Sequence, residues 1–267
     1  MAEVIDVDDP ADPRVDDFRD LSDADRRPDL PGRKGLVIAE GVVVVRRMLD
    51  SRFTPAALLG VGRRLDDLAD DLAGLDVPCY RADAQVMAEI VGFHLNRGVL
   101  AVAPRPPEPT LDEVLDRART VAVLEGVNDH ENLGSMFRNA AALGVDAVVF
   151  GPRCSDPLYR RSVRVSMGHV LRVPFARVAA WPRDLDVLRE RGFQLVALTP
   201  NPAAVTLAEA VTGERVALLL GAEGPGLTEE AMDACDVRAR IPMTPGVDSL
   251  NVATAAAMAF YERIRTT

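Results

Sequence analysis

Three polar loops, each following a short apolar run, hold the residues best suited to chemistry. The first is EGVNDHENLGSMFRNAAALG at residues 125–144, where Asn132 is followed six positions later by Arg138. An asparagine before a helix commonly caps it, and an arginine further along can simply face solvent. The same two side chains could also orient a substrate, because a guanidinium offers a planar fork of donors to a phosphate. Taken alone, this loop leaves both explanations open.

The second loop, LLLGAEGPGLTEEAM at residues 218–232, places Glu223 among three glycines. Glycine lets a ligand approach the backbone closely and tolerates positive φ, and packing gives no reason for a carboxylate there. A dinucleotide-binding loop is the obvious rival. It is disfavoured because the spacing is G-x-x-G-x-G with Pro225 inside it, near the end of the chain. The dinucleotide fingerprint instead opens its own strand–helix–strand unit.

The third loop, RIPMTPGVDSLNVATAAAMAFYERI at residues 240–264, brings Ser249 and Asn251 just before an alanine-rich stretch with a helical pattern. Either side chain can cap a helix, and two of them exceed what one cap needs. Small residues along the helix would let another helix or backbone pack closely. The helix is therefore either an ordinary buried element or part of a subunit interface.

The residues after position 110 predict the scaffold that these loops need. Runs of β-branched residues and leucine alternate with helical patterns, which indicates a parallel sheet covered by helices on both faces. Ligands of such sheets bind in loops at the carboxyl ends of the strands. The predicted strands are 121–127, 146–150, 173–175, 194–199, 216–221 and 237–242, and the predicted helices are 133–143, 157–166, 182–191, 228–234 and 250–264.

A smaller α/β domain is predicted before this one. PRPPEP at residues 104–109 has four prolines in six positions, which is typical of an extended connector. We therefore expect an acidic extension at 1–30, a first domain at 31–104, a linker at 105–110 and a second domain at 111–267. In the first domain the predicted strands are 36–39, 56–61, 78–80 and 99–103, and the predicted helices are 40–49, 64–73 and 83–92.

Charge is distributed unevenly along the chain. The net charge is −10, and residues 1–30 account for −7 of it through eleven acids and four arginines. Between Arg153 and Arg177, by contrast, there are six arginines and one acid. Such a basic run is either solvated surface or a phosphate-binding patch. Because the acidity is concentrated at one end, the net charge does not exclude a nucleic acid as partner.

Other function classes find little support in the sequence. No apolar stretch approaches the roughly 18 residues of a membrane span, so no membrane partner is expected. The acidic N-terminus is unlike a secretory signal, which favours a cytoplasmic protein. The three cysteines, Cys79, Cys154 and Cys235, lack the spacing of a zinc site, and the three histidines are scattered. We therefore predict no metal.

Taken together, the loops resemble a known family. Asn132 with Arg138, the run GAEGPG at 221–226, and IPM at 241–243 leading to SLN at 249–251 are similar to three motifs of the SpoU/TrmH-type RNA methyltransferases, in order. These belong to the SPOUT superfamily. The segment DPLYRRSVRVSMGHVLRVPF at 156–175 resembles the family's connecting segment. The likeness covers residues 119–265, and residues 33–103 more loosely resemble the family's L30-like RNA-binding domain.

The resemblance implies a fold, a cofactor and a reaction. The fold would be α/β, with a small L30-like N-terminal domain and a C-terminal parallel-sheet domain containing a deep trefoil knot. S-adenosyl-L-methionine would be the cofactor, and a ribose 2′-hydroxyl of RNA would receive the methyl group. The protein would be a homodimer formed through its C-terminal domain. Ribosomal RNA is preferred over transfer RNA, because the L30-like domain is commoner among relatives that act on ribosomal RNA.

The resemblance also implies roles for individual residues. The catalytic set would be Asn132, Arg138, Glu223, Ser249 and Asn251. The cofactor would be surrounded by Thr199, Gly221, Ile241, Met243 and Leu250. A guanidinium, with a pKa above about 12, is a poor base. Arg138 could therefore bind a phosphate while Glu223 or Ser249 takes the proton, and this alternative stays open.

RNA capture is expected to use the basic run, while the first domain recognises an RNA shape. The arginines expected to meet phosphates are Arg153, Arg160, Arg161, Arg164 and Arg172. Two other classes of function remain as alternatives. One is a non-catalytic RNA-binding or assembly factor of the same fold, and the other is an enzyme that binds a nucleotide such as NAD in the glycine-rich loop.

Overall fold

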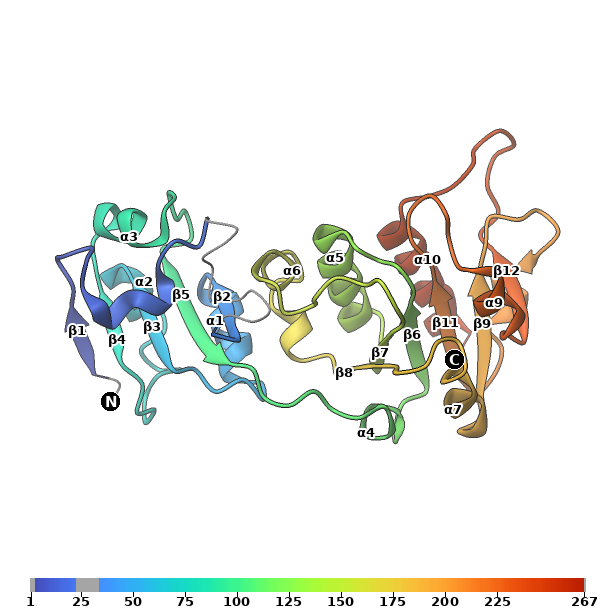
Figure 1. The fold of residues 1–267 in the computed structure, drawn as a ribbon, viewed down its shortest axis with the longest axis horizontal. Coiled ribbons are helices and arrows are strands. Elements are labelled where there is room, and N and C mark those ends of the chain that lie inside the picture. Colours follow the sequence, from blue (N-terminus) through green and yellow to red (C-terminus); the bar gives the residue numbers. More distant parts are fainter. Residues whose placement is uncertain (1–2, 23–33, 267) are drawn as a thin grey trace. The chain divides into compact units, whose positions relative to one another are not determined.

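The computed structural model describes residues 3–22 and 34–266 (Figure 1). Residues 1–2, 23–33 and 267, which include parts of the predicted extension and first domain, lie outside the described residues. The chain divides into two compact units. The first comprises Met1–Pro107 and Pro157–Arg172, and the second comprises Glu108–Asp156 and Val173–Thr267. The basic segment at 157–172, which the sequence pattern assigns to the second domain, thus belongs to the first unit.

The first unit is built on a five-stranded sheet of order β1-β4-β3-β5-β2. Strand β5 runs antiparallel to both of its neighbours, and the other pairs are parallel. The strands are β1 (Val4–Asp6), β2 (Leu36–Glu40), β3 (Ala57–Gly60), β4 (Cys79–Arg81) and β5 (Val99–Pro104). The helices are η1 (Pro13–Phe18), α1 (Val42–Leu49), α2 (Gly62–Asp66), α3 (Ala84–Val91), α6 (Arg160–Val165) and η2 (His169–Leu171).

Residues 3–22 of the predicted acidic extension contribute a strand and core side chains to the first unit. Strand β1 adds to the sheet beside β4, and Asp6 forms an ion pair with Arg81. Val7, Val15 and Phe18 are at most 1% exposed and join the hydrophobic cluster of the sheet. The many aspartates concealed this pattern, because acidic side chains can face solvent while single apolar residues between them point inward.

The second unit has the parallel sheet that the sequence predicts. Its seven strands follow the order β10-β12-β9-β11-β6-β7-β8, and every pair is parallel. The strands are β6 (Thr120–Leu124), β7 (Ala147–Phe150), β8 (Phe175–Arg177), β9 (Phe193–Leu198), β10 (Val205–Thr206), β11 (Arg215–Leu220) and β12 (Val237–Arg240). The helices are α4 (Leu111–Leu115), α5 (His130–Ala142), α7 (Leu185–Glu190), α8 (Leu207–Ala210), α9 (Glu229–Asp233) and α10 (Val252–Arg265).

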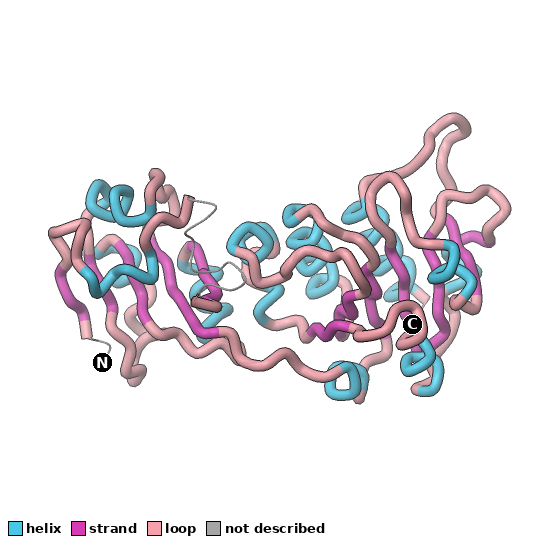
Figure 2. The backbone as a smooth tube through the Cα atoms, viewed as in Figure 1, coloured by secondary structure: helices cyan, strands magenta, loops and turns pink. Residues whose placement is uncertain are grey.

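Helices cover both faces of this sheet (Figure 2). Leu115 of α4 and Leu188 of α7 join a buried cluster with alternate strand residues such as Val149. The next residue along that strand, Phe150, points to the opposite face and stacks on Phe137 of α5 with ring centroids 6.1 Å apart. No helix in the described part of the chain combines the length and apolar character that a membrane crossing requires.

Helix α10 is fixed on the same side as α5, which matters because α10 begins at the third polar loop. Asn139 of α5 donates a hydrogen bond to the carbonyl of Ala253, at 3.2 Å. At the other end of α10, the buried guanidinium of Arg263 donates to the carbonyls of Val211, Gly213 and Glu214. These contacts fix the start of α10, and therefore Asn251, relative to the sheet.

Candidate functional site

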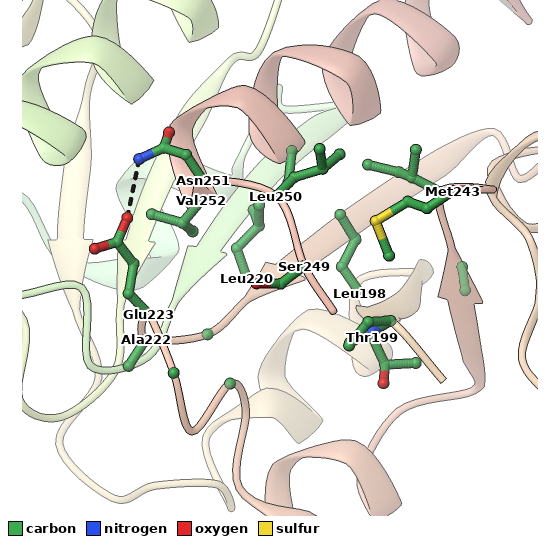
Figure 3. A pocket seen from close by; sticks show the side chains of 17 residues that line it. Leu198, Thr199, Leu220, Ala222, Glu223, Met243, Ser249, Leu250, Asn251 and Val252 are labelled. Carbon is green, nitrogen blue, oxygen red and sulfur yellow. Dashed lines mark hydrogen bonds between the residues drawn. The ribbon is translucent and has the colours of Figure 1, made fainter. Parts of the chain in front are cut away.

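A pocket of about 370 Å³ opens at the carboxyl ends of strands β9, β11 and β12 (Figure 3). The loops after these strands and the segment that enters α10 form its walls. Apolar side chains make up much of the lining, and Glu223 is the one ionisable side chain among the residues that line it. All five residues expected to surround a cofactor lie in the wall: Thr199, Gly221, Ile241, Met243 and Leu250.

The glycine-rich loop after β11 folds back on itself at the pocket floor. The amide of Gly226 donates to the carbonyl of Ala222 at 3.0 Å, so the chain doubles back within five residues. A Cβ atom on Gly221 would lie 2.1 Å from the carbonyl carbon of Gly226 and 2.1 Å from the nitrogen of Leu227. Only glycine fits at position 221, because backbone atoms occupy the space that a side chain would need.

Residues from all three polar loops meet at the edge of this pocket. The amide nitrogens of Asn132 and Asn251 each donate to Oε1 of Glu223, both at 2.9 Å. The nitrogen of Asn251 also lies 2.7 Å from Oδ1 of Asn132. Figure 3 shows Glu223 and Asn251 turned toward each other. We call Asn132, Glu223 and Asn251 the amide–carboxylate cluster.

Sheet order explains how the cluster forms. Strands β6 and β11 are neighbours, so the loops that follow them end at the same edge of the sheet. One interpretation of the sequence was that Asn132 simply caps its helix, but Asn132 is not the cap. Asp129 caps α5 instead by accepting from the amides of Glu131 and Asn132, at 2.9 and 2.8 Å. The Asn132 side chain is thereby left to contact Glu223.

Asn251 has two roles at once. Its Oδ1 accepts the amide of Thr254 at 3.1 Å and so caps α10, while its nitrogen faces Glu223 and Asn132. One amide group therefore links the helix start to the cluster. Ser249 is exposed, lines the pocket and makes no hydrogen bond with the rest of the described chain.

Of the expected catalytic set, only Arg138 neither lines the pocket nor belongs to the amide–carboxylate cluster. It is exposed on α5, does not line the pocket, and forms no ion pair or hydrogen bond with residues 3–22 or 34–266. Six positions from Asn132 correspond to about one and two-thirds helical turns, so the two side chains leave α5 on different sides. The Arg138 side chain therefore has no polar partner among the residues that the structure describes.

The five arginines expected to bind RNA differ in their surroundings. Arg153 lies in the second unit, and the other four lie in the first. Arg161 and Arg172 are exposed and Arg164 is half-buried. Arg153 is exposed but lies 3.3 Å from a carboxylate oxygen of buried Glu125. Arg160 is only 16% exposed and is 3.1 Å from a carboxylate oxygen of buried Glu40. It also lies over the ring of Phe93, so it is held by its own chain.

Two cysteines of the second unit are chemically quiet. Burial raises the pKa of the Cys154 thiol and raises that of Cys235 to about 12. Both thiols are therefore protonated near neutral pH and are poor nucleophiles. The described ranges contain no group of three or more His, Cys, Asp or Glu side chains that could hold a metal ion.

One buried acid beside the pocket escaped the sequence-based prediction. Glu125 at the end of β6 is 1% exposed and accepts hydrogen bonds from Trp181 and Thr228. An acid at the end of a buried run is the only signal that the sequence carries for it, because its partners are 56 and 103 positions away.

A parallel α/β sheet with a glycine-lined pocket at its carboxyl edge and a polar cluster at the pocket mouth defines an α/β enzyme domain that binds a nucleotide-like cofactor. The model of the SpoU rRNA Methylase family matches residues 119–261, and the chain belongs to this family. The prediction of an SpoU/TrmH-type protein is thus confirmed.

Individual relatives agree with this assignment. An uncharacterized tRNA/rRNA methyltransferase of Mycobacterium tuberculosis is 67% identical over 99% of this chain and 93% of its own. The 23S rRNA (guanosine-2′-O-)-methyltransferase RlmB of Vibrio parahaemolyticus is 30% identical over 84% of this chain and 95% of its own. The crystal structure of an AdoMet-bound rRNA methyltransferase from Sinorhizobium meliloti has 26% identity and a TM-score of 0.82, covering 98% of each chain.

Proposed function

We propose that this protein transfers a methyl group from S-adenosylmethionine to a ribose 2′-hydroxyl of RNA. The observation that carries the proposal is the amide–carboxylate cluster at the mouth of the pocket, since it places a hydrogen-bonded carboxylate where an acceptor hydroxyl would enter. The Vibrio relative is named for 2′-O-methylation of a guanosine in 23S rRNA, and the Sinorhizobium relative is described with AdoMet bound.

The pocket suits S-adenosylmethionine. Its volume and its largely apolar walls suit a nucleoside-sized ligand. Leu198, Ile241 and Leu250 would hold the apolar part, while Thr199 and the glycine-rich loop would supply polar contacts. When bound, this cofactor supplies an electrophilic methyl group on a positively charged sulfur.

Glu223 is the residue best placed to accept the hydroxyl proton. Its Oε1 accepts both asparagine amides, whereas Oε2 takes part in no hydrogen bond with the described residues. The amides orient the carboxylate and leave one oxygen for the ribose hydroxyl. With S-adenosylmethionine bound, its methyl group would be available to the ribose oxygen, and Oε2 of Glu223 would take up the proton that the hydroxyl loses. Arg138, exposed and unpartnered within the described ranges, would bind the adjacent phosphate and orient the ribose.

RNA capture would involve both units. The first unit would act as an L30-like RNA-recognition domain, with Arg161, Arg164 and Arg172 contacting phosphates. Arg153 would contribute from the second unit, and Arg160 is better described as a structural partner of Glu40. Ribosomal RNA is our preferred substrate. Transfer RNA is the alternative, and the name of the Mycobacterium relative includes both.

A homodimer through the second unit is supported by one face of α10. Met258, Tyr261 and Ile264 are 44%, 56% and 49% exposed. Spaced three residues apart, they form an apolar stripe on the helix surface, which a second copy would cover. We also propose that the second unit contains the deep trefoil knot of the family. A cytoplasmic location fits this role.

Calorimetry with S-adenosylmethionine and with NAD tests the proposed function at its cofactor. We expect saturable binding of S-adenosylmethionine and none of NAD, because the spacing of the glycine-rich loop does not match a dinucleotide fingerprint. Binding of NAD alone would overturn the proposal. Binding of S-adenosylmethionine without methyl transfer to RNA would favour the alternative of a non-catalytic RNA-binding factor.

Reversing the charge of Arg161 and Arg172 together should weaken RNA binding regardless of sequence. Each lost phosphate contact reduces the slope of log affinity against log salt concentration by about 1. The double variant R161E/R172E should therefore bind RNA at least about tenfold more weakly at low salt and show a flatter salt dependence. These positions avoid Arg160, whose reversal would place two carboxylates side by side at Glu40.

The matched control is R117E, which reverses a charge on a side chain that is 97% exposed and outside the basic run. Binding is measured by fluorescence anisotropy from low to moderate salt. An affinity and salt slope equal to those of the wild type in R161E/R172E would identify the basic run as ordinary solvated surface.

A further inference from the structure

Glu125 lies beneath the glycine-rich loop and is the most enclosed carboxyl group near the pocket, at 1% exposure. It accepts from the indole nitrogen of Trp181 at 2.9 Å. Thr228 donates twice, through its amide at 2.9 Å and its hydroxyl at 3.0 Å. A buried carboxyl group is tolerated only when its oxygens are satisfied in this way. Two separate segments of the chain thus donate to a residue outside the expected catalytic set.

The hydrogen bonds of Glu125 hold both ends of the glycine-rich loop. Its backbone amide donates to the carbonyl of Leu220 at 2.9 Å, directly before the loop begins at Gly221. Its side chain binds Thr228, directly after the loop ends at Leu227. The segment between these two anchor points carries Glu223. Moving Glu125 would therefore move the carboxylate of the amide–carboxylate cluster.

The same residue also fixes the first polar loop. Glu125 directly follows strand β6, and Gly126 comes next with φ of +69°. A Cβ on Gly126 would lie 3.0 Å from the Cβ of Ala222, so this loop and the glycine-rich loop pack closely here. Asn132, which binds Glu223, follows only a few residues later. Glu125 thus sets the distance between two loops whose side chains must meet.

A fourth donor reaches Glu125 from the solvent side. The guanidinium of Arg153 lies 3.3 Å from Oε1, although its side chain is 68% exposed. The backbone of Arg153 has φ of +60°, a left-handed conformation that costs a non-glycine residue about 1 kcal/mol. A strained backbone of this kind persists only where the surrounding structure holds it. The contact between Arg153 and buried Glu125 is therefore part of a site with a fixed geometry.

We infer that Glu125 is a positioning residue for methyl transfer, which holds the glycine-rich loop so that Glu223 meets Asn132 and Asn251. This inference rests on the proposed function for its chemical meaning. Glu125 does not line the pocket, so it acts through the loop and not on the substrate. Misplacement of a reacting group by about 1 Å can cost about 100-fold in rate, so a shifted loop would lower turnover strongly.

The variant E125Q tests this role. A glutamine would turn an NH₂ group toward donors that need an acceptor, so the loop should shift while the chain still folds. We expect turnover to fall about 30-fold or more, the KM for RNA to stay within about twofold, and the affinity for S-adenosylmethionine to weaken. The milder variant W181F removes one donor and keeps an aromatic ring over Gly151, and should lower turnover several-fold.

The matched control is D146N, at the opposite end of strand β6. Asp146 accepts from the amides of Arg119 and Thr120 at 2.8 and 2.9 Å, so the substitution also removes a carboxylate that binds this strand. It lies away from the pocket wall and should change thermal stability without changing turnover per folded molecule. Comparing E125Q with D146N therefore separates loop positioning from general destabilisation.

Trp181 provides an independent readout, because it is the only tryptophan of the chain. Its indole binds Glu125, so its emission should change when S-adenosylmethionine orders the loop, and this change should be reduced in E125Q but kept in D146N. If E125Q kept both the turnover and the emission change of the wild type, the inference would be overturned. If E125Q did not fold, a wild-type turnover in W181F would overturn it instead. Failure of the wild-type protein to methylate RNA would refute the proposed function instead, and the emission and affinity measurements would still test the role of Glu125.

Discussion

Replacing Gly221 with alanine should abolish the binding of S-adenosylmethionine. The added Cβ would lie 2.1 Å from two backbone atoms of the same loop, far inside van der Waals contact. Backbone cannot move aside as a flexible side chain can, so the glycine-rich loop must open and the pocket floor must deform. We expect the dissociation constant to rise at least about 100-fold, with turnover lost in parallel.

The control for this substitution is G192A. Gly192 lies in the same unit with φ of +80°, and a Cβ there would meet no atom within 4 Å. This variant should lose about 1 kcal/mol of stability through backbone strain and keep its affinity for the cofactor. Calorimetry and thermal unfolding on both variants measure the difference. If G221A bound S-adenosylmethionine as the wild type does, the pocket would not be the cofactor site.

Replacing Glu223 with glutamine should nearly eliminate methyl transfer while leaving cofactor binding largely intact. A glutamine retains the shape of the side chain and can still accept one amide, but it cannot take a proton from a hydroxyl. General-base catalysis commonly contributes about 100- to 10,000-fold, so turnover should fall by at least about 100-fold. The affinity for S-adenosylmethionine should change by less than about fivefold, because most of the pocket lining is apolar and unchanged.

Single-turnover transfer of a labelled methyl group to RNA measures this effect. The control is E209Q, in the same unit, where Glu209 belongs to the capping box of α8 and is exposed. E209Q should weaken that helix cap and leave the transfer rate unchanged. A transfer rate in E223Q within a few-fold of the wild type would mean that another group accepts the proton, and Ser249 would become the first candidate.

The second unit could be predicted from sequence because its signals are local. Buried parallel strands appear as continuous apolar runs, and the loops after them hold residue types that packing does not require. The runs that predict β6, β9 and β11 coincide with the observed strands to within a few residues. Their order in the sheet, which brings Asn132 next to Glu223, is not encoded in any one segment.

The features that the sequence did not predict depend on partners far along the chain. Arg160 has the sequence context of a phosphate ligand, and its ion pair with Glu40 joins residues 120 positions apart. Glu125 is inconspicuous until Trp181 and Thr228 are seen to converge on it. Val15 and Phe18 are surrounded by aspartates, and only the sheet beneath them shows that they are core residues. In each case, contacts between residues far apart in the sequence determine the role of the side chain.

Ribose methylation in cells tests most directly whether this pocket serves methyl transfer to an RNA ribose. Sites of 2′-O-methylation would be mapped across ribosomal and transfer RNA from cells that contain the wild-type protein, E223Q or no protein. We predict that one or a few ribose positions, in ribosomal RNA, lose their methyl group both without the protein and with E223Q. An identical 2′-O-methylation map in all three cell lines would contradict the account.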